Sequence, residues 1–239
     1  LDLVAIQEED DDQFMLYLNE GFDDADNLEF VQVYTFYRSS GDISASRILA
    51  ISDYDNDGDQ DVYVGRKYGY NWFFENQTLT GLPGDVTYHS NPEPFFIEKA
   101  VPLGIADFEV NEIGSMGYGA AWGDYDNDQD FDLYLTNWGV NRLYKNDNNS
   151  FTNVADVQNV ESEELSNGVS WGDYNNDGFL DLWASNIRTR DDVYINLGDG
   201  NWDATASPYF LSGTQDVISG DINDDGWLDV FAAGLKMQN

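Results

Sequence analysis

Cysteine is absent from this chain, so neither disulfide bridges nor thiolate-bound zinc can stabilise it. Apolar runs are short, and none approaches the ~20 residues that a membrane-spanning helix needs. Histidine occurs once, as His89, and neither a glycine-rich phosphate loop nor a G-x-S-x-G nucleophile turn is present. We therefore expect a protein that is not an enzyme, although a paired-carboxylate glycosidase is compatible with the composition.

Basic residues are also scarce. The chain has 10 Lys and Arg against 46 Asp and Glu, which gives a formal charge of −36. Such a charge repels nucleic acid and anionic membrane surfaces, and it opposes compaction unless cations offset it. A hydrophobic content of 41% and an aromatic content of 15% are nevertheless too high for a disordered acidic chain. A packed core is therefore expected.

Four acidic segments repeat along the chain. They read SDYDNDGDQDVYV from Ser52, GDYDNDQDFDLYL from Gly123, GDYNNDGFLDLWA from Gly172 and GDINDDGWLDVFA from Gly220. The underlying period is about fifty residues, which indicates a repeat architecture. We call the four nine-residue stretches acidic loops 1 to 4: residues 53–61, 124–132, 173–181 and 221–229.

Each repeat has the same internal order. An apolar segment precedes the acidic loop, a β-rich run follows it, and two more short runs complete the unit, with Gly, Asn and Asp at the turns. No segment shows a convincing helical period. Four short strands per repeat predict an all-β fold, a β-propeller of four-stranded blades, with about four to five blades in this chain. The expected blades are 1–46 (partial), 47–112 (with an insertion at 77–94), 113–163, 164–211 and 212–239 (partial).

The ends read as incomplete blades, and the chain begins with Leu1 rather than Met. We therefore expect a processed or partial product that belongs to a larger propeller or to an assembly covering its two ends.

The spacing D-x-[DN]-x-D-G-x-x-D places oxygen ligands at positions 1, 3, 5 and 9 of a tight loop, with a backbone carbonyl from position 7. Hard oxygen ligands in that number favour Ca²⁺ over Mg²⁺, which demands stricter geometry. An EF-hand is excluded because position 12 lacks its glutamate and strands, not helices, flank the loop. Simple solvation of the loops is the alternative, but it requires no fixed spacing. The predicted ligands of about four Ca²⁺ sites are Asp53, Asp55, Asp57, Asp59 (carbonyl) and Asp61; Asp124, Asp126, Asp128, Asp130 (carbonyl) and Asp132; Asp173, Asn175, Asp177, Phe179 (carbonyl) and Asp181; Asp221, Asn223, Asp225, Trp227 (carbonyl) and Asp229.

Glycine at position 6 permits a turn with positive φ. Gly58, Gly178 and Gly226 fill this position, but loop 2 has Gln129 there. A non-glycine residue in that conformation costs on the order of 1–2 kcal/mol. Loop 2 therefore departs furthest from the geometry that the pattern requires.

The phrases WGDYDNDQDFDLYLTN, WGDYNNDGFLDLWASN, SGDINDDGWLDVFAAG, NRLYKND and FFIEKAVPLGI resemble the FG-GAP/VCBS repeats of integrin α-subunit propellers and of bacterial surface proteins. The resemblance implies a propeller, commonly seven-bladed, with calcium between the first and second strands of a blade. It also implies an extracellular role in adhesion or ligand binding without catalysis, but it does not identify the ligand.

The loops on the rim opposite the acidic loops are rich in basic and aromatic residues. They form a candidate surface for a glycan or protein ligand, and the alternative is that the basic residues merely pair with nearby acids. The predicted ligand-binding residues are Arg66, Lys67, Tyr68, Tyr70, Trp138, Arg142, Arg188 and Arg190. Asn76 and Asn148 lie in glycosylation sequons. Trp122, Trp171 and Trp227 are expected to pack in the core or between blades.

The leading hypothesis is thus an extracellular, secreted or cell-surface module, stabilised by calcium, that binds or adheres to a glycan or protein. It would have no nucleic-acid partner and would not insert into membranes. A structural subunit that assembles with copies of itself into a filament or surface layer is the second hypothesis. The non-catalytic scaffold of a polysaccharide-active enzyme is the third.

Overall fold

The computed structural model describes residues 3–7, 13–22, 28–37, 46–67, 69–77, 96–107, 117–206 and 213–234. Within these residues the chain forms five antiparallel sheets and one four-residue helix. None of the described residues forms a helix long and apolar enough to span a membrane. His89 and nearly all of the expected insertion at 77–94 lie outside the described residues.

Three of the sheets have four strands, and in each of them the strands pair in the order in which they occur along the chain. The first contains β4 (Ser46–Ser52), β5 (Asp61–Arg66), β6 (Trp72–Asn76) and β7 (Phe96–Glu98). The second contains β8 (Gly117–Gly123), β9 (Asp132–Asn137), β10 (Arg142–Asn146) and β11 (Phe151–Asn153). The third contains β12 (Ser166–Gly172), β13 (Asp181–Asn186), β14 (Asp192–Asn196) and β15 (Trp202–Ala206).

Two smaller sheets flank these three. The N-terminal sheet contains β1 (Leu3–Gln7), β2 (Gln13–Phe22) and β3 (Leu28–Tyr37). The C-terminal sheet contains β16 (Thr214–Gly220) and β17 (Asp229–Gly234). The all-β fold of sequential four-stranded blades predicted from the repeats is confirmed, and the arc of blades does not close into a ring.

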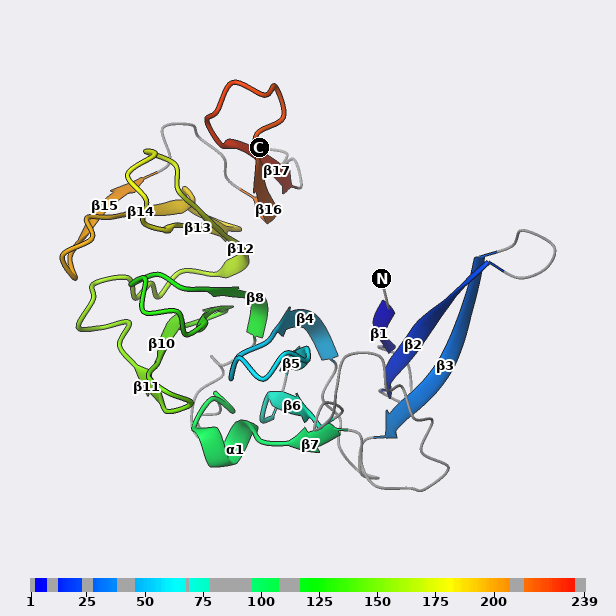
Figure 1. The fold of residues 1–239 in the computed structure, drawn as a ribbon. Helices are drawn as coiled ribbons and strands as arrows, with labels where there is room; N and C mark the ends of the chain where they lie inside the picture. The colour runs from blue at the N-terminus through cyan, green and yellow to red at the C-terminus, as the bar shows by residue number, and fades with distance from the viewer. Residues whose placement is uncertain are drawn as a thin grey trace.

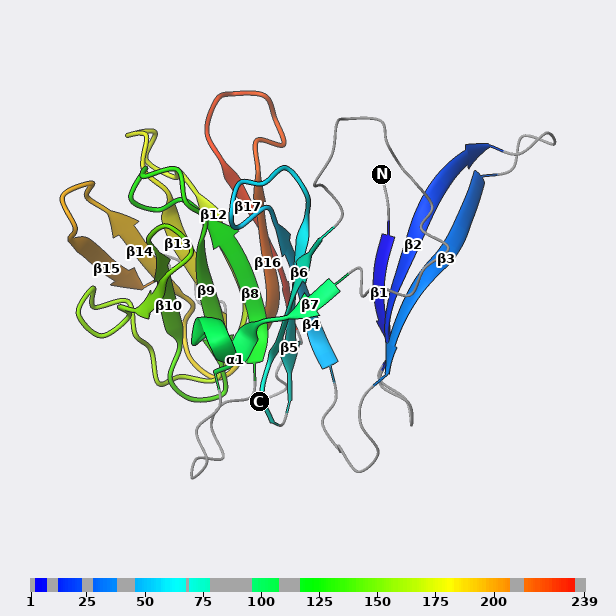
Figure 2. The same ribbon diagram turned by 60° about the horizontal axis from the view of Figure 1, so that its bottom comes forward.

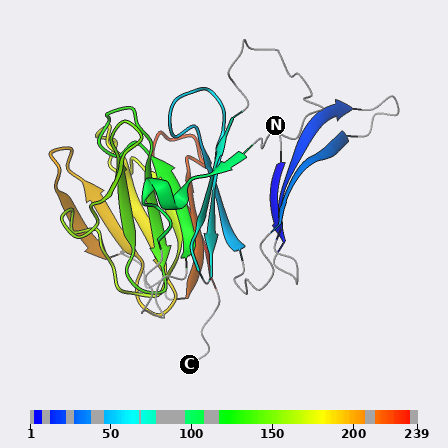
Figure 3. The ribbon, with the colours of Figure 1, turned by 90° about the horizontal axis from the view of Figure 1, so that it is seen from below.

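The sheets are arranged around a common centre. The first strand of each repeat packs against the first strand of the next, so β4, β8, β12 and β16 line the inside, and the later strands lie outside them (Figure 1). The β1–β3 sheet lies on the side of β4, at one end of the row of sheets (Figure 3). The four acidic loops all emerge on the same side, which is the upper side in Figure 2. This side is called the acidic rim below, and the side of the loops that join second to third strands is called the opposite rim.

The second strand of each complete blade is covered on both faces. All six residues of β5 and all six of β9 are buried, which explains their nearly continuous apolar runs VYVG and LYLT. The covering residues come from the neighbouring sheets, so the core lies between blades. One cluster joins Tyr63 and Phe73 to Leu133 and Trp122, and a second joins Tyr134 to Leu182 and Trp171. Full burial of one such side chain stabilises the fold by about 1.5–3 kcal/mol.

Trp122 and Trp171 thus pack between blades as predicted, whereas the prediction for Trp227 is wrong. Trp227, in loop 4, is 54% exposed, and Ile218 and Phe231 of the adjoining β16–β17 sheet are 65% and 63% exposed. The β16–β17 sheet packs against β12 and β13, and these three side chains lie outside that contact.

The fourth run of the first complete blade also differs from a plain strand. Only Phe96–Glu98 forms β7, and helix α1 (Ala100–Leu103) follows at once. Pro102 cannot donate a ladder hydrogen bond but is tolerated in the first turn of a helix. The Glu98 carboxylate accepts a hydrogen bond from the Ala100 N–H at 2.8 Å. The helix places Ala100 and Ile105 in the core.

Close packing of the inner strands requires glycine at two equivalent positions. A Cβ atom on Gly168 of β12 would lie 2.6 Å from the Cα of Asp216 and 2.9 Å from the backbone nitrogen of Val217. A Cβ on Gly119 of β8 would overlap the carbonyl oxygen of Asn167. Backbone leaves no room for a side chain here, so these glycines set the spacing between neighbouring blades.

Replacing Gly168 with alanine is therefore expected to destabilise the protein by about 1–3 kcal/mol, because the new methyl group meets backbone that cannot rotate away. Thermal or urea unfolding measures the change. Gly220→Ala is the matched control, since a Cβ at Gly220 of β16 meets no atom within 4 Å. Equal stability of the two variants would contradict this account of the inner strands.

Candidate metal centres

Each acidic loop connects the first and second strands of a blade, so the repeat places all four loops on one rim. The loops join β4 to β5, β8 to β9, β12 to β13 and β16 to β17. Figure 2 shows them side by side. The short distance between the two strands forces the nine residues to coil tightly.

Two residues with positive φ produce the coil in every loop. Position 4 is left-handed, with φ of 57° at Asn56, 60° at Asn127, 57° at Asn176 and 58° at Asp224. Position 6 has φ of 97° at Gly58, 92° at Gly178 and 88° at Gly226. Gln129 adopts the same turn, with φ of 78°. Loop 2 therefore has the geometry of the other loops and bears the strain of a side chain there, on the order of 1–2 kcal/mol.

The first aspartate of each loop holds the turn in place. The Asp53 carboxylate accepts hydrogen bonds from the N–H groups of Asp57 and Gly58, each at 3.0 Å. Asp124, Asp173 and Asp221 accept the equivalent pairs. In each loop the aspartate at position 5 accepts from the N–H of position 7, the residue whose carbonyl is a predicted ligand. Backbone N–H groups thus hold these carboxylates in position without a cation.

The ninth aspartate is buried in the three complete blades. Asp61 is 1% exposed, and Asp132 and Asp181 are 0% exposed. Burial is the largest cause that raises the pKa of Asp61 and of Asp132 to about 8, although backbone donors act in the opposite direction. Burial also raises the pKa of Asp181 above its usual range. A buried carboxylate without a positive partner is costly, so these residues favour either a proton or a cation.

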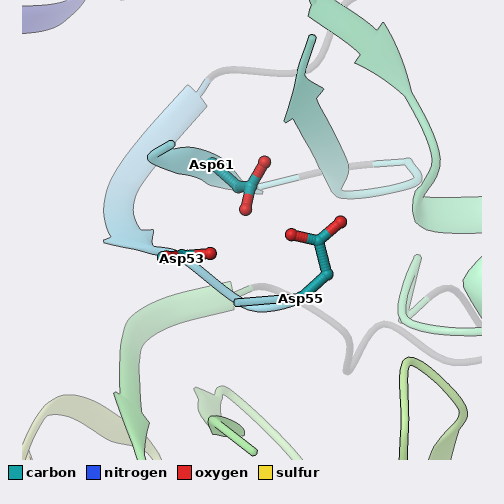
Figure 4. A group of neighbouring side chains, drawn as sticks. All are labelled: Asp53, Asp55 and Asp61. Atoms are coloured by element: carbon teal, nitrogen blue, oxygen red, sulfur yellow. The ribbon is translucent and has the colours of Figure 1, made fainter. Parts of the chain in front are cut away.

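Three carboxylates converge in loop 1. Asp53, Asp55 and Asp61 each place one oxygen within 4.8 Å of the others, and Figure 4 shows the three groups facing one another. Oδ1 of Asp55 is buried and has no hydrogen-bond partner. Neighbouring carboxylates and burial raise the pKa of Asp55, with burial the larger cause. An unpartnered buried oxygen among carboxylates is a suitable environment for a hard divalent cation, so loop 1 fits the predicted ion.

Loop 2 also brings three carboxylates together, those of Asp124, Asp126 and Asp128, within 4.8 Å. Here, however, the ammonium group of Lys145 reaches into the loop and pairs with Asp126 and Asp128. Position 3 of loops 3 and 4 is asparagine. The side-chain oxygens of Asn175 and Asn223 accept the N–H of the aspartate at position 5, at 3.0 and 2.9 Å.

Sequence reasoning missed one class of residue, the asparagine that ends the third strand. The N–H groups of Asn76, Asn146 and Asn196 each donate to the ninth aspartate of their own blade at 2.8 Å. The signal was visible in the repeats, because NWFFEN, NRLYKN and DDVYIN all end in Asn. Asn76, a predicted glycosylation site, therefore braces loop 1, and its side chain donates to the Gln60 carbonyl at 3.2 Å. Asn148, the other predicted glycosylation site, is exposed.

The asparagine at position 4 connects each loop to the next. The Asn56 side chain donates to the Gln129 carbonyl at 3.1 Å, Asn127 donates to the Gly178 carbonyl at 3.1 Å, and Asn176 donates to the Gly226 carbonyl at 3.0 Å. In all three bonds the acceptor is position 6 of the following loop. The four acidic loops therefore form one hydrogen-bonded series along the rim.

Comparison with protein families identifies the repeats. Residues 124–184 and 173–232 each match the model of the FG-GAP-like repeat, and the matches include acidic loops 2, 3 and 4. Residues 124–232 thus consist of FG-GAP-like repeats. No curated protein matches the sequence. Each FG-GAP-like match starts at the first aspartate of one loop and includes the whole of the next loop. Each match therefore crosses one interface between blades.

On the opposite rim, two predicted ligand-binding residues line one cavity of about 360 Å³ between the first two complete blades. Tyr70 is 48% exposed, and Arg142 pairs with the buried carboxylate of Asp107 at 3.3 Å. Asp107 also accepts a hydrogen bond from the Asn137 amide at 2.9 Å. The remaining lining residues are Val101, Gly104, Ala106, Tyr144 and Asn153.

The other predicted ligand-binding residues that the structure describes are not among those lining this cavity. Arg66 is buried, with its guanidinium 3.9 Å from the centre of the Trp72 ring. Trp138 stacks on Tyr118 with ring centres 4.5 Å apart. Arg188 and Arg190 are exposed in the loop between β13 and β14, and Lys67 is half-buried. Tyr68 lies outside the described residues.

The raised pKa values predict an unusual pH dependence for the metal-free protein. In a chelating buffer we expect the melting temperature to rise as the pH is lowered from about 9 to about 6. The folded protein takes up protons at Asp61 and Asp132, whose pKa is about 8, whereas the same groups stay ionised in the unfolded chain until near 3.8. Stability is therefore lost as the pH rises through 8. Differential scanning calorimetry at several pH values measures this slope.

Asp132→Asn removes one titrating group and should flatten the slope, while Asp203→Asn, at an exposed position on β15, is the control. A melting temperature that falls on mild acidification of the chelated protein would contradict this assignment.

Proposed function

We propose that the chain is a calcium-stabilised part of an extracellular β-propeller whose opposite rim binds a glycan or protein ligand. The observation that carries the calcium part is the unpartnered buried oxygen of Asp55, which lies among the converging carboxylates of loop 1. Oxygen-only donors, a high local negative charge and a coiled backbone suit Ca²⁺ better than Mg²⁺. The ion would supply the positive charge that the chain itself lacks.

The residues that would hold the ion in loop 1 are Asp53, Asp55, Asp57 and Asp61, with the carbonyl of Asp59. The corresponding sets in loops 3 and 4 contain three aspartates and one asparagine each. Neutralisation removes the repulsion among carboxylates on a chain with a formal charge of −36. A site whose free ion stands at 100 times its dissociation constant stabilises the fold by about 2.7 kcal/mol.

The ligand part of the proposal is supported by the cavity on the opposite rim. An exposed aromatic ring at Tyr70 beside the paired groups of Arg142 and Asp107 offers one stacking surface and several hydrogen-bonding groups. Such a combination is common in ligand sites, where apolar and aromatic walls accompany a few fixed polar groups. A sugar ring matches both properties. Assembly with copies of itself is a second candidate, favoured by the exposed Ile218 and Phe231 of the β16–β17 sheet.

Calcium dependence is tested by thermal unfolding. Chelation should lower the melting temperature by many degrees, and added Ca²⁺ should restore it at lower concentration than Mg²⁺. Asp55→Asn should weaken the response to Ca²⁺, because it removes the charge of a converging ligand. Asp203→Asn, an exposed change of the same charge on β15, should leave the response intact. A melting temperature that is the same in chelator and in Ca²⁺ would refute the calcium proposal.

Ligand binding is tested by screening the calcium-loaded protein on arrays of acidic and neutral glycans. Tyr70→Ala should abolish retention of a bound glycan, since it removes the exposed ring that lines the cavity. Trp227→Ala is the control, because Trp227 has similar exposure but lies on the acidic rim. Equal retention by both variants would place the ligand site elsewhere.

A further inference from the structure

Lys145 of β10 occupies an unusual place for a lysine, because its side chain enters one of the acidic loops. Its ammonium nitrogen lies 3.3 Å from Oδ2 of Asp128 and also contacts Oδ2 of Asp126. The side chain is 32% exposed, so the ion pair is partly withdrawn from solvent. The ammonium group thus has two carboxylate partners in the same loop.

The residue before the last one of the third strand has the same register in every complete blade, because Phe74, Tyr144 and Tyr194, which precede it, pair with Val62, Leu133 and Leu182. The residue that follows it is the bracing asparagine, Asn76, Asn146 or Asn196, which bonds the ninth aspartate at 2.8 Å in each case. The preceding residue is Glu75 in the first complete blade, Lys145 in the second and Ile195 in the third. At this position the three blades therefore carry a negative, a positive and a neutral residue, while their acidic loops share one backbone geometry.

The negative residue of the first blade does not neutralise loop 1. The Glu75 carboxylate is paired with Lys99 at 2.8 Å and accepts a hydrogen bond from the Tyr54 hydroxyl at 2.7 Å. Loop 1 keeps the unpartnered oxygen of Asp55 described above. Among the described residues, loop 2 is the acidic loop in which a lysine forms an ion pair with the aspartates themselves.

The two aspartates that Lys145 binds are the predicted ligands at positions 3 and 5. Ca²⁺ requires six to eight oxygens at 2.3–2.6 Å, and an ammonium group that holds two of them competes directly with the ion. Oδ1 of Asp126 has no hydrogen-bond partner, like Oδ1 of Asp55 in loop 1, but the other oxygen of the Asp126 carboxylate is already held by the ammonium group. Loop 2 also bears the strain of Gln129 at position 6.

We propose that Lys145 serves as the built-in cation of loop 2, so that this loop stays metal-free at Ca²⁺ concentrations that fill loops 1, 3 and 4. The inference rests on the proposed calcium binding by those other loops. Loop 2 then keeps its shape at any calcium concentration. Through Asn56 and Asn127 it bonds loop 1 and loop 3, so it is a fixed element between two loops that depend on the ion.

Exchange of the side chains between blades tests the proposal. The wild-type chain, Lys145→Ile and Ile195→Lys are titrated with Ca²⁺ by isothermal titration calorimetry after exhaustive chelation. Lys145→Ile should bind one more ion than the wild type, because the competing ammonium group is gone. Ile195→Lys should bind one ion fewer, since it brings the same group to loop 3. Lys145→Arg keeps the charge and should gain no site.

A second readout is independent of ion counting. In chelator, Lys145→Ile should melt below the wild type, because loop 2 loses its neutralising partner, and Ca²⁺ should restore the difference. Identical calcium stoichiometry and affinity in the wild type and in Lys145→Ile would overturn the role of Lys145 while leaving the proposed calcium binding intact. Absence of calcium binding in all variants, including the wild type, would overturn both.

Discussion

Repulsion among clustered carboxylates is the constraint on which the acidic rim depends. Backbone N–H groups offset part of it, since the first and ninth aspartates of each complete blade accept hydrogen bonds from their own loop or from the third strand. These bonds fix the geometry but add no net positive charge. The remaining charge must be met by a proton, a side-chain cation or a metal ion, and the four loops differ in which of these their neighbours make available.

The packing between blades and the acidic rim depend on the same residues of the repeat. The tyrosine at position 2 of loop 2, Tyr125, stacks on Trp171 of the next blade with ring planes 8° apart. The bracing asparagine of that next blade, Asn196, donates its side chain to the Tyr125 carbonyl at 2.7 Å. A change in loop geometry is therefore transmitted to the apolar core between sheets. We therefore expect that unfolding of the acidic loops also disrupts the packing between blades.

Much of this arrangement could be predicted from the sequence, because the repeat signals occur at short range. Alternating apolar runs and the turn residues indicated the strands, and the spacing of the aspartates indicated coiled loops, including the strained turn at Gln129. The contacts of Lys145 could not be predicted in this way, since they join a third-strand side chain to a loop 17 to 19 residues earlier in the chain. The exposure of Trp227 likewise depends on which sheet lies beside it rather than on local pattern. Arg66 was misread as a surface group because sequence does not reveal that Trp72 covers its guanidinium.

The side-chain amide at position 4 gives the rim a direction. Asn56, Asn127 and Asn176 each donate a hydrogen bond to the loop that follows. The donors therefore all point in one direction, from the first complete blade towards the C-terminal sheet. In loop 4 this position is Asp224, which has no side-chain amide to donate the equivalent hydrogen bond. A group that packed beside loop 4 at this position would therefore meet carboxylate oxygens in place of an amide donor. A lysine, an arginine or a shared ion could form that junction, but another copy of the asparagine-to-carbonyl link could not.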